Sequence, residues 1–348
     1  MIQDNQMFSV RVPSNIALVK YWGKSDSAQQ WPANDSISMT LANALTETAA
    51  CVIDGSEHLV TLNGKKVGRS DHPKIFSHLD WLLAEHGDGF PGQALEVVSS
   101  NSFPTGCGIA SSASGFGALT LAAFGALVGE DLVMDMMHGD AGREQIAHWA
   151  RQGSGSGGRS LFGGYVKWER GADPATQRIK QLHKQDHWDL VDLITVFSDQ
   201  PKSIGSTLGH KSAWTSPLFE ARLRGLPERI KAAEAAIAAK DLDTLGPIIE
   251  ADALEMHSVM MSSEPALRYF GCEVGQFLAL IRDIRQDRGL GCYFTIDAGP
   301  NVHVITTPSD AQQVSDIIKE NYPGVVVLED KTGGEPSFSV KPRGDIDG

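Results

Sequence analysis

Residues 104–128 read PTGCGIASSASGFGALTLAAFGALV, a glycine- and serine-rich turn that runs directly into a long apolar segment. The apolar stretch is rich in Ala, Leu and Phe, so it predicts a buried helix over residues 111–128. Gly106 and Gly108 let the backbone approach a ligand closely, and N–H groups at the start of a helix attract phosphate oxygens. The segment predicts either an anion-binding turn or a turn that only caps a helix, and the pattern alone leaves both open.

Ser111 and Ser112 stand at the start of this predicted helix. Their hydroxyl groups could bind phosphate oxygens or a magnesium ion. The segment is not a P-loop of the Walker type, because no Gly-Lys-Ser/Thr sequence follows the first glycines.

The first half of the chain predicts a domain of mixed helix and strand around the apolar helix. An amphipathic stretch predicts a further helix over residues 141–152. Alternating or apolar runs predict strands over residues 8–12, 36–41, 95–99 and 161–169. We place the domain boundary between residues 188 and 189, which divides the chain into 1–188 and 189–348.

The second half predicts long helices followed by a small β-rich unit. Helices are expected over residues 219–240, 242–261 and 274–288, and Pro227 is expected to break the first of them. Strands and one shorter helix (309–321) complete this half. The strands are expected over residues 190–197, 291–296, 302–306 and 325–328. This order of elements predicts a separate α+β layer, and no structure is predicted for the tail after Lys331.

Composition and charge bound the kind of protein. The chain has 348 residues, of which 41% are apolar and 21% are charged, and its net charge is −13. Such a composition is globular and excludes a disordered or fibrous chain. The negative charge argues against general binding to nucleic acid or to an anionic membrane, because both need a basic surface. An acidic protein that binds an anionic substrate must therefore gather its cations locally.

The cysteines and the N-terminus bear on location. The four cysteines show no C-x-x-C spacing, which argues against a zinc site or a disulfide framework and favours a reducing compartment. The N-terminus lacks the basic flank and apolar core of a signal peptide. The longest apolar run, residues 115–129, is shorter than the roughly 20 residues of a membrane span. We therefore expect a soluble, cytoplasmic protein.

Residues 13–24 read PSNIALVKYWGK and place two lysines four residues apart in a chain that is short of cations. Lys20 and Lys24 could converge on one anion, such as a phosphorylated substrate, and Tyr21 could add a hydroxyl group. The alternative is an amphipathic edge segment whose lysines are only solvated.

Residues 151–160 read RQGSGSGGRS and separate a predicted helix from a predicted strand. Ser154 and Ser156 offer hydroxyl groups, and Arg159 can grip a carboxylate or phosphate with two parallel hydrogen bonds. A flexible linker is the alternative, but two arginines wedged between regular elements favour a binding function.

Two further polar segments are ambiguous on the sequence alone. Residues 297–301 read DAGPN between two apolar strands, which suits a turn, although Asp297 could also take a proton from a substrate hydroxyl group. His257, near the end of a predicted helix, is expected to be a packed or hydrogen-bonded helix residue rather than a metal ligand.

Taken together, these segments resemble the GHMP family of small-molecule kinases, and within it a branch of ATP-dependent decarboxylases. The resemblance runs from Pro13 to about Val304 and rests on five segments in the same order. They are NIALVKYWGK (15–24), SNSFPTGCGIASSASGF (100–116), ARQGSGSGGRSLFGGYVKWERG (150–171), MHSVMMSSEP (256–265) and FTIDAGPN (294–301). The resemblance implies an α+β fold of two domains, the N-terminal one α/β and ribosomal-protein-S5-like, and the C-terminal one α+β and ferredoxin-like.

Enzymes of this branch use ATP and Mg²⁺ to phosphorylate the tertiary 3-hydroxyl group of mevalonate 5-diphosphate. The new phosphate then leaves while the carboxylate departs as carbon dioxide, which gives isopentenyl diphosphate on the mevalonate route to isoprenoids. The resemblance therefore implies ATP and Mg²⁺ as cofactors and mevalonate 5-diphosphate as substrate. It also implies a cytoplasmic homodimer that binds neither nucleic acid nor a membrane.

The resemblance assigns roles by position. Asp297 would contact the 3-hydroxyl group as general base or orienting group near Lys20, and Arg159 is the third expected catalytic residue. Substrate binding is implied for Tyr21, Lys24, Ser154, Ser156 and Arg159. Contact with ATP is implied for Ser38, Pro104, Gly106, Gly108, Ala110, Ser111 and Ser112, and Ser112 is also the expected magnesium ligand.

Two other functions stay open on the sequence alone. A phosphomevalonate decarboxylase, or a mevalonate kinase that acts at the 3-hydroxyl group, would belong to the same branch. Asp297 together with Lys20 and Lys24 favours the diphosphate enzyme. A non-catalytic relative would bind nucleotide without releasing ADP, and the presence of every polar motif position argues against it.

Overall fold

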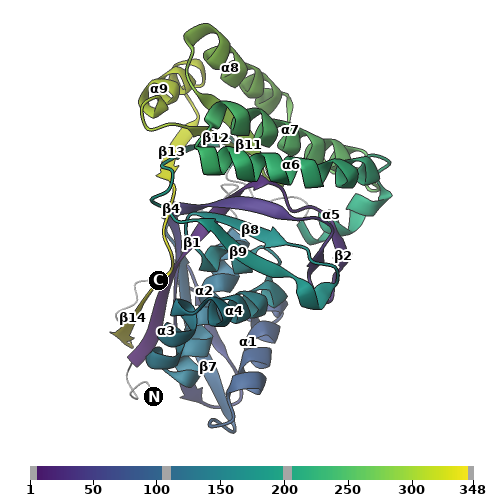
Figure 1. Cartoon of the computed structure of the whole chain (residues 1–348). Coiled ribbons are helices and arrows are strands. Elements are labelled where there is room, and N and C mark those ends of the chain that lie inside the picture. The colour runs from purple at the N-terminus through teal and green to yellow at the C-terminus, as the bar shows by residue number, and fades with distance from the viewer. Residues whose placement is uncertain (1–5, 104–110, 199–205, 344–348) are drawn as a thin grey trace.

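A computed structural model describes residues 6–103, 111–198 and 206–343 of the chain. These residues form a larger and a smaller β-sheet, each covered by helices, and the two layered units stand one above the other (Figure 1). The larger sheet comes mainly from the first half of the chain and the smaller sheet from the second half. The predicted α+β architecture with two domains is therefore confirmed.

The larger sheet has the order β14-β1-β4-β7-β5-β6, and β8 pairs with both β4 and β9. Its strands are β1 (Gln6–Val19), β4 (Ser36–Asp54), β5 (Leu59–Leu62), β6 (Lys65–Val67), β7 (Gln93–Asn101), β8 (Tyr165–Glu169), β9 (Arg178–His183) and β14 (Ser337–Pro342). A short hairpin of β2 (Lys24–Asp26) and β3 (Trp31–Pro32) follows β1. Strand β4 pairs with β8 near its beginning and with β7 near its end, so one long strand links the two parts of the sheet.

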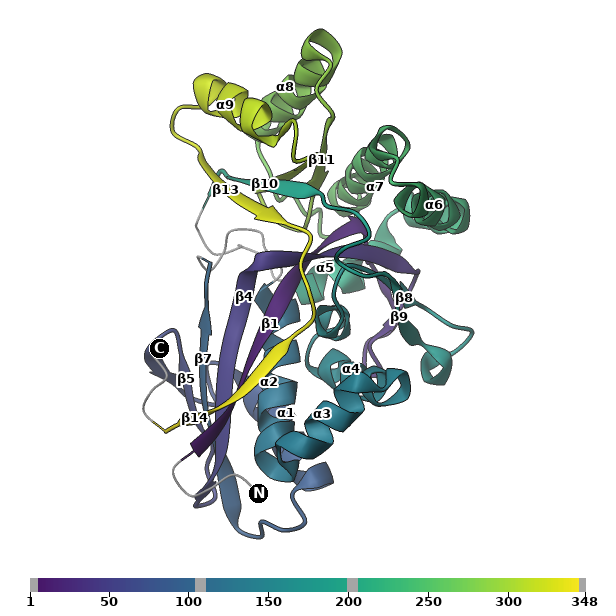
Figure 2. The ribbon, with the colours of Figure 1, turned by 60° about the vertical axis from the view of Figure 1, so that its left-hand side comes forward.

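Four helices cover one face of this sheet (Figure 2). They are α1 (Pro73–His86), α2 (Ser111–Val128), α3 (Glu130–His138) and α4 (Asp140–Gly153). Helix α2 packs against β1 and β4, and a Cβ atom at Gly125 would lie 2.2 Å from the Phe8 ring, so only glycine permits this approach. Helix α2 is long and apolar enough to cross a membrane, but 72% of that stretch is buried inside the fold, as in a core helix.

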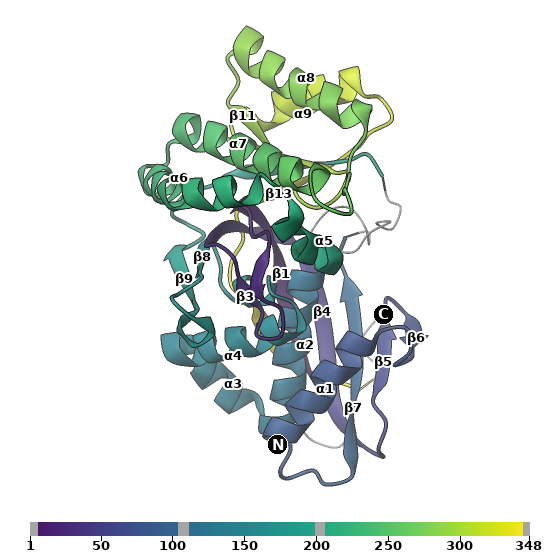
Figure 3. The same cartoon turned by 90° about the vertical axis from the view of Figure 1, so that its right-hand side faces the viewer.

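The smaller sheet is antiparallel throughout, in the order β11-β12-β10-β13. Its strands are β10 (Val191–Val196), β11 (Cys292–Ile296), β12 (Val302–Thr306) and β13 (Val326–Lys331). The helices of this half are α5 (Ser206–Ser212), α6 (Phe219–Ala239), α7 (Leu242–Met261), α8 (Cys272–Arg288) and α9 (Ala311–Asn321). Helix α5 lies between the helices of the two domains (Figure 3).

Alternation along β10 sends neighbouring side chains into two different cores. Leu193 belongs to a core with α8 and α9 residues such as Phe277 and Ile318. Ile194 belongs to a second core that also contains Ile16 of β1 and residues of α6 and α7. The second core joins the two domains, so their relative position is held by buried apolar contacts.

Most predicted elements are confirmed, although α1, α3 and β9 are examples of elements that were not predicted. Three further findings concern α6, the strand predicted over 161–169 and the tail. Helix α6 continues through Pro227, so the predicted break is wrong. One proline costs a helix about 3 kcal/mol, but the buried residues Leu226 and Ile230 contribute about 1.5–3 kcal/mol each, so packing offsets that cost. The strand predicted over 161–169 begins only at Tyr165, because a short 3-10 helix, η1 (Gly157–Leu161), precedes it.

The third finding concerns the tail, for which no structure was predicted. Strand β14 pairs with β1 in antiparallel fashion, so the end of the chain returns to the larger sheet. On the way, the carboxylate of Asp330 accepts hydrogen bonds from the backbone N–H groups of Ala42, Asn43 and Ala44. The division of the chain at residue 188 stays a prediction, and these contacts tie its two parts together.

Candidate active site

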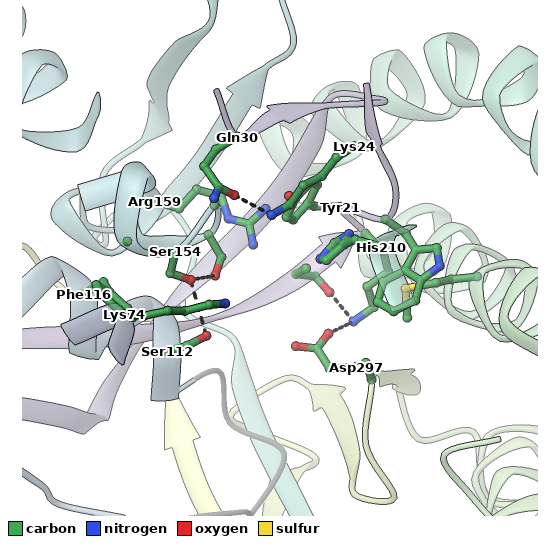
Figure 4. A pocket seen from close by; sticks show the side chains of 18 residues that line it. Tyr21, Lys24, Gln30, Lys74, Ser112, Phe116, Ser154, Arg159, His210 and Asp297 are labelled. Carbon is green, nitrogen blue, oxygen red and sulfur yellow. Dashed lines mark hydrogen bonds and ion pairs between the residues drawn. The ribbon is translucent and has the colours of Figure 1, made fainter. Parts of the chain in front are cut away.

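A cavity of about 280 Å³ opens between the two domains (Figure 4). Its walls come from the end of β1, the starts of α1 and α2, the turn after α4, helix α5 and the loop after β11. The lining residues are Ala17, Lys20, Tyr21, Trp22, Lys24, Gln30, Lys74, Ser112, Phe116, Gly153, Ser154, Gly155, Ser156, Arg159, His210, Met256, Asp297 and Ala298. Polar and charged side chains therefore converge here from both domains.

Lys20 and Asp297 form an ion pair across the domain boundary. The Lys20 Nζ atom lies 2.6 Å from Asp297 Oδ1 and donates a second hydrogen bond to the Ala17 carbonyl oxygen at 2.7 Å. The lysine side chain is 2% exposed and the aspartate side chain 22% exposed, so the ammonium group lies behind a carboxylate that faces the cavity. This carboxylate can orient a hydroxyl group or accept its proton.

Three buried side chains hold the backbone of Lys20. Asp252 of α7 accepts its N–H at 2.7 Å, and Asn34 donates to its carbonyl oxygen at 2.9 Å. Arg222 of α6 donates to the same carbonyl oxygen at 3.4 Å and pairs with the Asp252 carboxylate at 3.0 Å. The position of Lys20 after the end of β1 is thus set by Asn34 of its own domain and by two helices of the other domain.

His257 and Asn301 hold the loop that carries Asp297 in place. Asn301 Oδ1 accepts the backbone N–H groups of Phe197 and Ser198 at 2.8 and 3.1 Å. His257 is buried in α7 and hydrogen-bonds with the backbone of residues 296 and 297, while burial and the nearby Lys20 charge lower its pKa to about 4. His257 is therefore a neutral, packed helix residue, as the sequence predicts.

The wall opposite Asp297 is basic. Arg159 is 3% exposed and donates from Nη1 to Ser36 Oγ at 2.5 Å, while burial lowers the pKa of its guanidinium to about 10, which leaves the group charged at neutral pH. Lys24 donates to Gln30 at 2.5 Å, and burial with the nearby Lys74 charge lowers its pKa to about 8. A locally positive site in an acidic protein is confirmed.

The glycine-rich turn after α4 brings hydroxyl groups into the same space. Ser154 Oγ lies 3.5 Å from Ser112 Oγ and 3.4 Å from Ser156 Oγ. A Cβ atom at Gly155 would lie 2.8 Å from the Tyr21 hydroxyl oxygen, so glycine is needed for the turn to approach that ring. The Tyr21 hydroxyl is buried without a hydrogen-bond partner among the described residues, and burial raises its pKa, so it stays a neutral donor.

A second cavity, of about 300 Å³, adjoins the first at the start of α2, because Ser112 and Phe116 line both. Much of its wall is apolar, and its polar groups are amides, hydroxyls and one histidine rather than acids or lysines. The remaining lining residues are Thr46, Leu62, Asn63, His72, Ile75, Val97, Ser99, Ser100, Asn101, Ser111, Gly115 and Leu119. An apolar slot with a few amide and hydroxyl groups suits a planar heterocycle.

The structure brings most of the predicted site residues together. Lys20, Tyr21, Lys24, Ser112, Ser154, Ser156, Arg159 and Asp297 line the first cavity, and Ser111 lines the second. Ser38 is not among the lining residues: it is fully buried on β4, and its hydroxyl has no partner among the described residues. Pro104, Gly106, Gly108 and Ala110 lie outside the described residues.

Sequence reasoning missed three polar side chains of the first cavity: Gln30, which accepts a hydrogen bond from Lys24, and also Lys74 and His210. Lys74 comes from the first turn of α1 and His210 from α5, and neither stands in a segment with a recognisable spacing. In Figure 4, Lys74 and Ser112 reach into the cavity from the side opposite Asp297. For Lys74 the sequence holds no signal beyond a cation in an acidic chain. His210 follows a polar segment, residues 198–207, whose composition suits either a loop that closes over a nucleotide or an ordinary surface loop.

Two protein families match the chain along most of its length. The family described as diphosphomevalonate decarboxylase-like N-terminal domain matches residues 12–179, and that described as mevalonate 5-diphosphate decarboxylase C-terminal domain matches residues 192–346. The diphosphomevalonate decarboxylase of Candida albicans is 34% identical over 330 residues, which cover 90% of this chain and 88% of the relative.

Solved structures of similar proteins share the fold as a whole. A mevalonate diphosphate decarboxylase from Staphylococcus aureus superposes with a TM-score of 0.85 at 32% identity and covers 96% of this chain and 98% of its own. A structure described as "MDDEF in complex with MVAPP, AMPPCP and Magnesium" has a TM-score of 0.86 at 30% identity, with coverage of 97% and 99%.

Proposed function

The chain belongs to the diphosphomevalonate decarboxylase family, and we propose that it converts mevalonate 5-diphosphate and ATP to isopentenyl diphosphate, ADP, phosphate and carbon dioxide. One observation carries the assignment to this cavity: the Lys20–Asp297 pair faces a basic wall and the start of α2 across a single space. The reaction needs a carboxylate beside the substrate hydroxyl group, cations around the diphosphate and the start of a helix for the nucleotide phosphates.

The reaction has two steps because hydroxide is a poor leaving group. The 3-hydroxyl oxygen first attacks the γ-phosphorus of ATP, its proton leaves, and ADP is released. The C3–O bond then breaks, with phosphate as the leaving group, and the carboxylate carbon–carbon bond supplies the electron pair of the new double bond as carbon dioxide departs. Charge therefore develops first on the transferring phosphoryl group and then at C3.

Asp297 and Lys20 serve the first step. The Asp297 carboxylate holds the 3-hydroxyl group in line with the γ-phosphate or accepts its proton, since Asp297 lines the cavity. Lys20 is fixed 2.6 Å behind the carboxylate, where its charge offsets negative charge on the phosphoryl group in transit. The bonds from Asp252 and Asn34 to its backbone keep the ammonium in place before the substrate arrives.

The basic wall binds the anionic ends of the substrate. Arg159 and Lys24 supply the charge, and Tyr21, Ser154 and Ser156 supply hydroxyl donors to the diphosphate and carboxylate. Because the tyrosine hydroxyl has no partner among the described residues, a substrate oxygen would satisfy it. Lys74 on the far side extends the positive surface toward the start of α2.

The nucleotide would lie along the start of α2. Its base fits the apolar second cavity, and its phosphates would then reach Ser111 and Ser112, where the two cavities meet. Mg²⁺ prefers oxygen ligands and takes few from the protein when phosphates are present, which fits the Ser112 hydroxyl beside the Asp297-lined cavity. The ion, when bound, neutralises charge on the phosphates, and Ser112 would hold it.

The proposal is tested by measuring ADP and carbon dioxide release with mevalonate 5-diphosphate, its monophosphate and mevalonate side by side. We expect equal amounts of ADP and carbon dioxide, with the diphosphate as the best substrate. Preference for the monophosphate would indicate a phosphomevalonate decarboxylase, and ADP without carbon dioxide a 3-kinase. Nucleotide binding with no ADP release would indicate a non-catalytic relative.

The pKa of Lys24 predicts a pH limit on substrate capture. Burial and the neighbouring charges of Lys74 and Lys211 lower this pKa to about 8, so the empty enzyme loses the charge as pH rises through 8. We expect kcat/KM to fall above this pH, because kcat/KM reports ionisations of the free enzyme. In a Lys24→Arg variant the guanidinium stays charged, so the fall should move to higher pH. A pH profile that is identical in both enzymes would contradict the role of Lys24.

The resemblance alone supports two further parts of the proposal: a homodimeric assembly and a cytoplasmic location. The net charge of −13 supports the absence of nucleic-acid and membrane binding. Light scattering of the purified protein tests the dimer, with a monomeric mass as the opposing result.

A further inference from the structure

His210 is a cavity residue to which neither the sequence motifs nor the reaction scheme above assign a role. It lies on α5, 8% exposed, and its ring stacks on Tyr21 at 4.3 Å between centroids and lies 4.6 Å from the Trp22 ring. Figure 4 shows the imidazole between Tyr21 and Asp297. Two aromatic neighbours leave the ring little freedom to turn.

The hydrogen bonds of the ring define its tautomer. Nδ1 accepts the backbone N–H of Gly23 at 3.1 Å, so in the neutral ring the proton must be on Nε2. Nε2 has no hydrogen-bond partner among the described residues, and the ring lines the cavity. The side chain thus offers one N–H donor of fixed direction to whatever enters.

Burial and the surrounding charges keep His210 neutral. Burial is the largest cause, and the nearby charges of Lys24, Arg159 and Lys74 act in the same direction, so its pKa falls to about 3. A fourth cation in this cluster would add repulsion in the empty enzyme. A neutral imidazole gives a donor without that repulsion.

We propose that His210 binds the diphosphate group of the substrate as a neutral donor through Nε2–H. The proposal rests on the proposed function and assigns His210 to a particular end of the substrate. The His210 ring stacks on Tyr21, the residue that the Ser154–Ser156 turn approaches at Gly155, and its Nδ1 atom bonds to Gly23, the neighbour of Lys24. His210 therefore belongs with the cations that bind the anionic end, not with the pair at the reacting hydroxyl group.

The alternative is that His210 only packs in the wall of the cavity. Two variants distinguish this packing role from the donor role. Asparagine places its amide near the position of Nδ1, so His210→Asn can keep the bond to Gly23 but loses the donor at Nε2. Glutamine reaches the position of Nε2, so His210→Gln keeps a donor to the cavity but loses the bond to Gly23. His187→Asn, outside both cavities, is the matched control.

The test first requires turnover of mevalonate 5-diphosphate by the wild type; without it the proposed function fails before His210 is examined. KM for the substrate and the inhibition constant of inorganic diphosphate are then measured for each variant. We expect His210→Asn to raise both roughly 10- to 100-fold, as for one hydrogen bond to a charged group, with kcat little changed. His210→Gln should recover most of the loss.

Two results would overturn the proposal. If His210→Asn binds diphosphate like the wild type while His210→Gln is impaired, the ring only packs and holds Gly23. If KM rises but the inhibition constant of inorganic diphosphate does not, His210 contacts another part of the substrate. Should both variants unfold, ¹⁵N spectra of histidine-labelled wild type decide: diphosphate must shift the Nε2 resonance of His210, and an unchanged resonance contradicts the bond.

Discussion

An Asp297→Asn variant is expected to lose turnover by roughly 10²–10⁴-fold while it still folds and binds both substrates. Asparagine is nearly isosteric, and its amide oxygen can still accept the hydrogen bond that Lys20 Nζ makes at 2.6 Å. An amide cannot take the proton of the 3-hydroxyl group, so phosphoryl transfer loses its base. Because phosphorylation precedes loss of carbon dioxide, the rates of ADP and carbon dioxide release should fall together.

Measuring ADP and isopentenyl diphosphate in parallel shows which outcomes would contradict this prediction. Normal ADP release without isopentenyl diphosphate would mean that Asp297 acts only after phosphoryl transfer. Normal rates of both would reduce Asp297 to a turn residue. Asp310→Asn is the matched control, since this aspartate caps the backbone of Gly291 in the same domain and lines neither cavity. It should keep wild-type turnover.

The fold was predictable where one local pattern dominates. The helices over 111–128 and 242–261 and the strand over 302–306 have the predicted ends, because their apolar spacing and flanking turns agree. Pro227 misled the prediction because burial of α6 against α7 outweighs a local preference. Strand β14 could not be foreseen, since pairing with β1 depends on where a distant part of the chain lies.

The site was predictable where chemistry and spacing coincide in one segment. Lys20, Arg159 and Asp297 stand in motifs, and the structure brings them to one cavity. Lys74 and His210 reach the same space from elements whose local sequence serves helix formation. Asp252 lines neither cavity, and its carboxylate accepts the backbone N–H of Lys20 rather than binding a ligand. Its role in positioning Lys20 is therefore visible only in the structure.

Arg159→Lys is the second change for which a large effect is expected, a fall in kcat/KM of at least roughly 10²-fold. Arg159 is anchored from Nη1 to Ser36, which aims the remaining donors of its planar fork at the cavity. Lysine keeps a positive charge, but all its N–H donors sit on one nitrogen atom, so it loses the two parallel bonds to a carboxylate or phosphate, each worth about 1.5–3 kcal/mol. Burial lowers the pKa of either side chain. Because the ordinary pKa of lysine is below that of arginine, a lysine buried at this position loses its charge nearer to neutral pH.

Arg151→Lys separates the loss of a ligand contact from the loss of a buried guanidinium. Arg151 is also buried, but it bonds to Gln177 and His148 and does not line the cavity. Both variants should unfold at lower temperature, whereas only Arg159→Lys should raise KM for mevalonate 5-diphosphate strongly. If both variants lost the same amount of kcat/KM, Arg159 would have only a packing role, because burial is what the two arginines have in common. A much larger loss in Arg159→Lys would place the Arg159 guanidinium on the substrate, because paired hydrogen bonds distinguish arginine from lysine although both carry one positive charge.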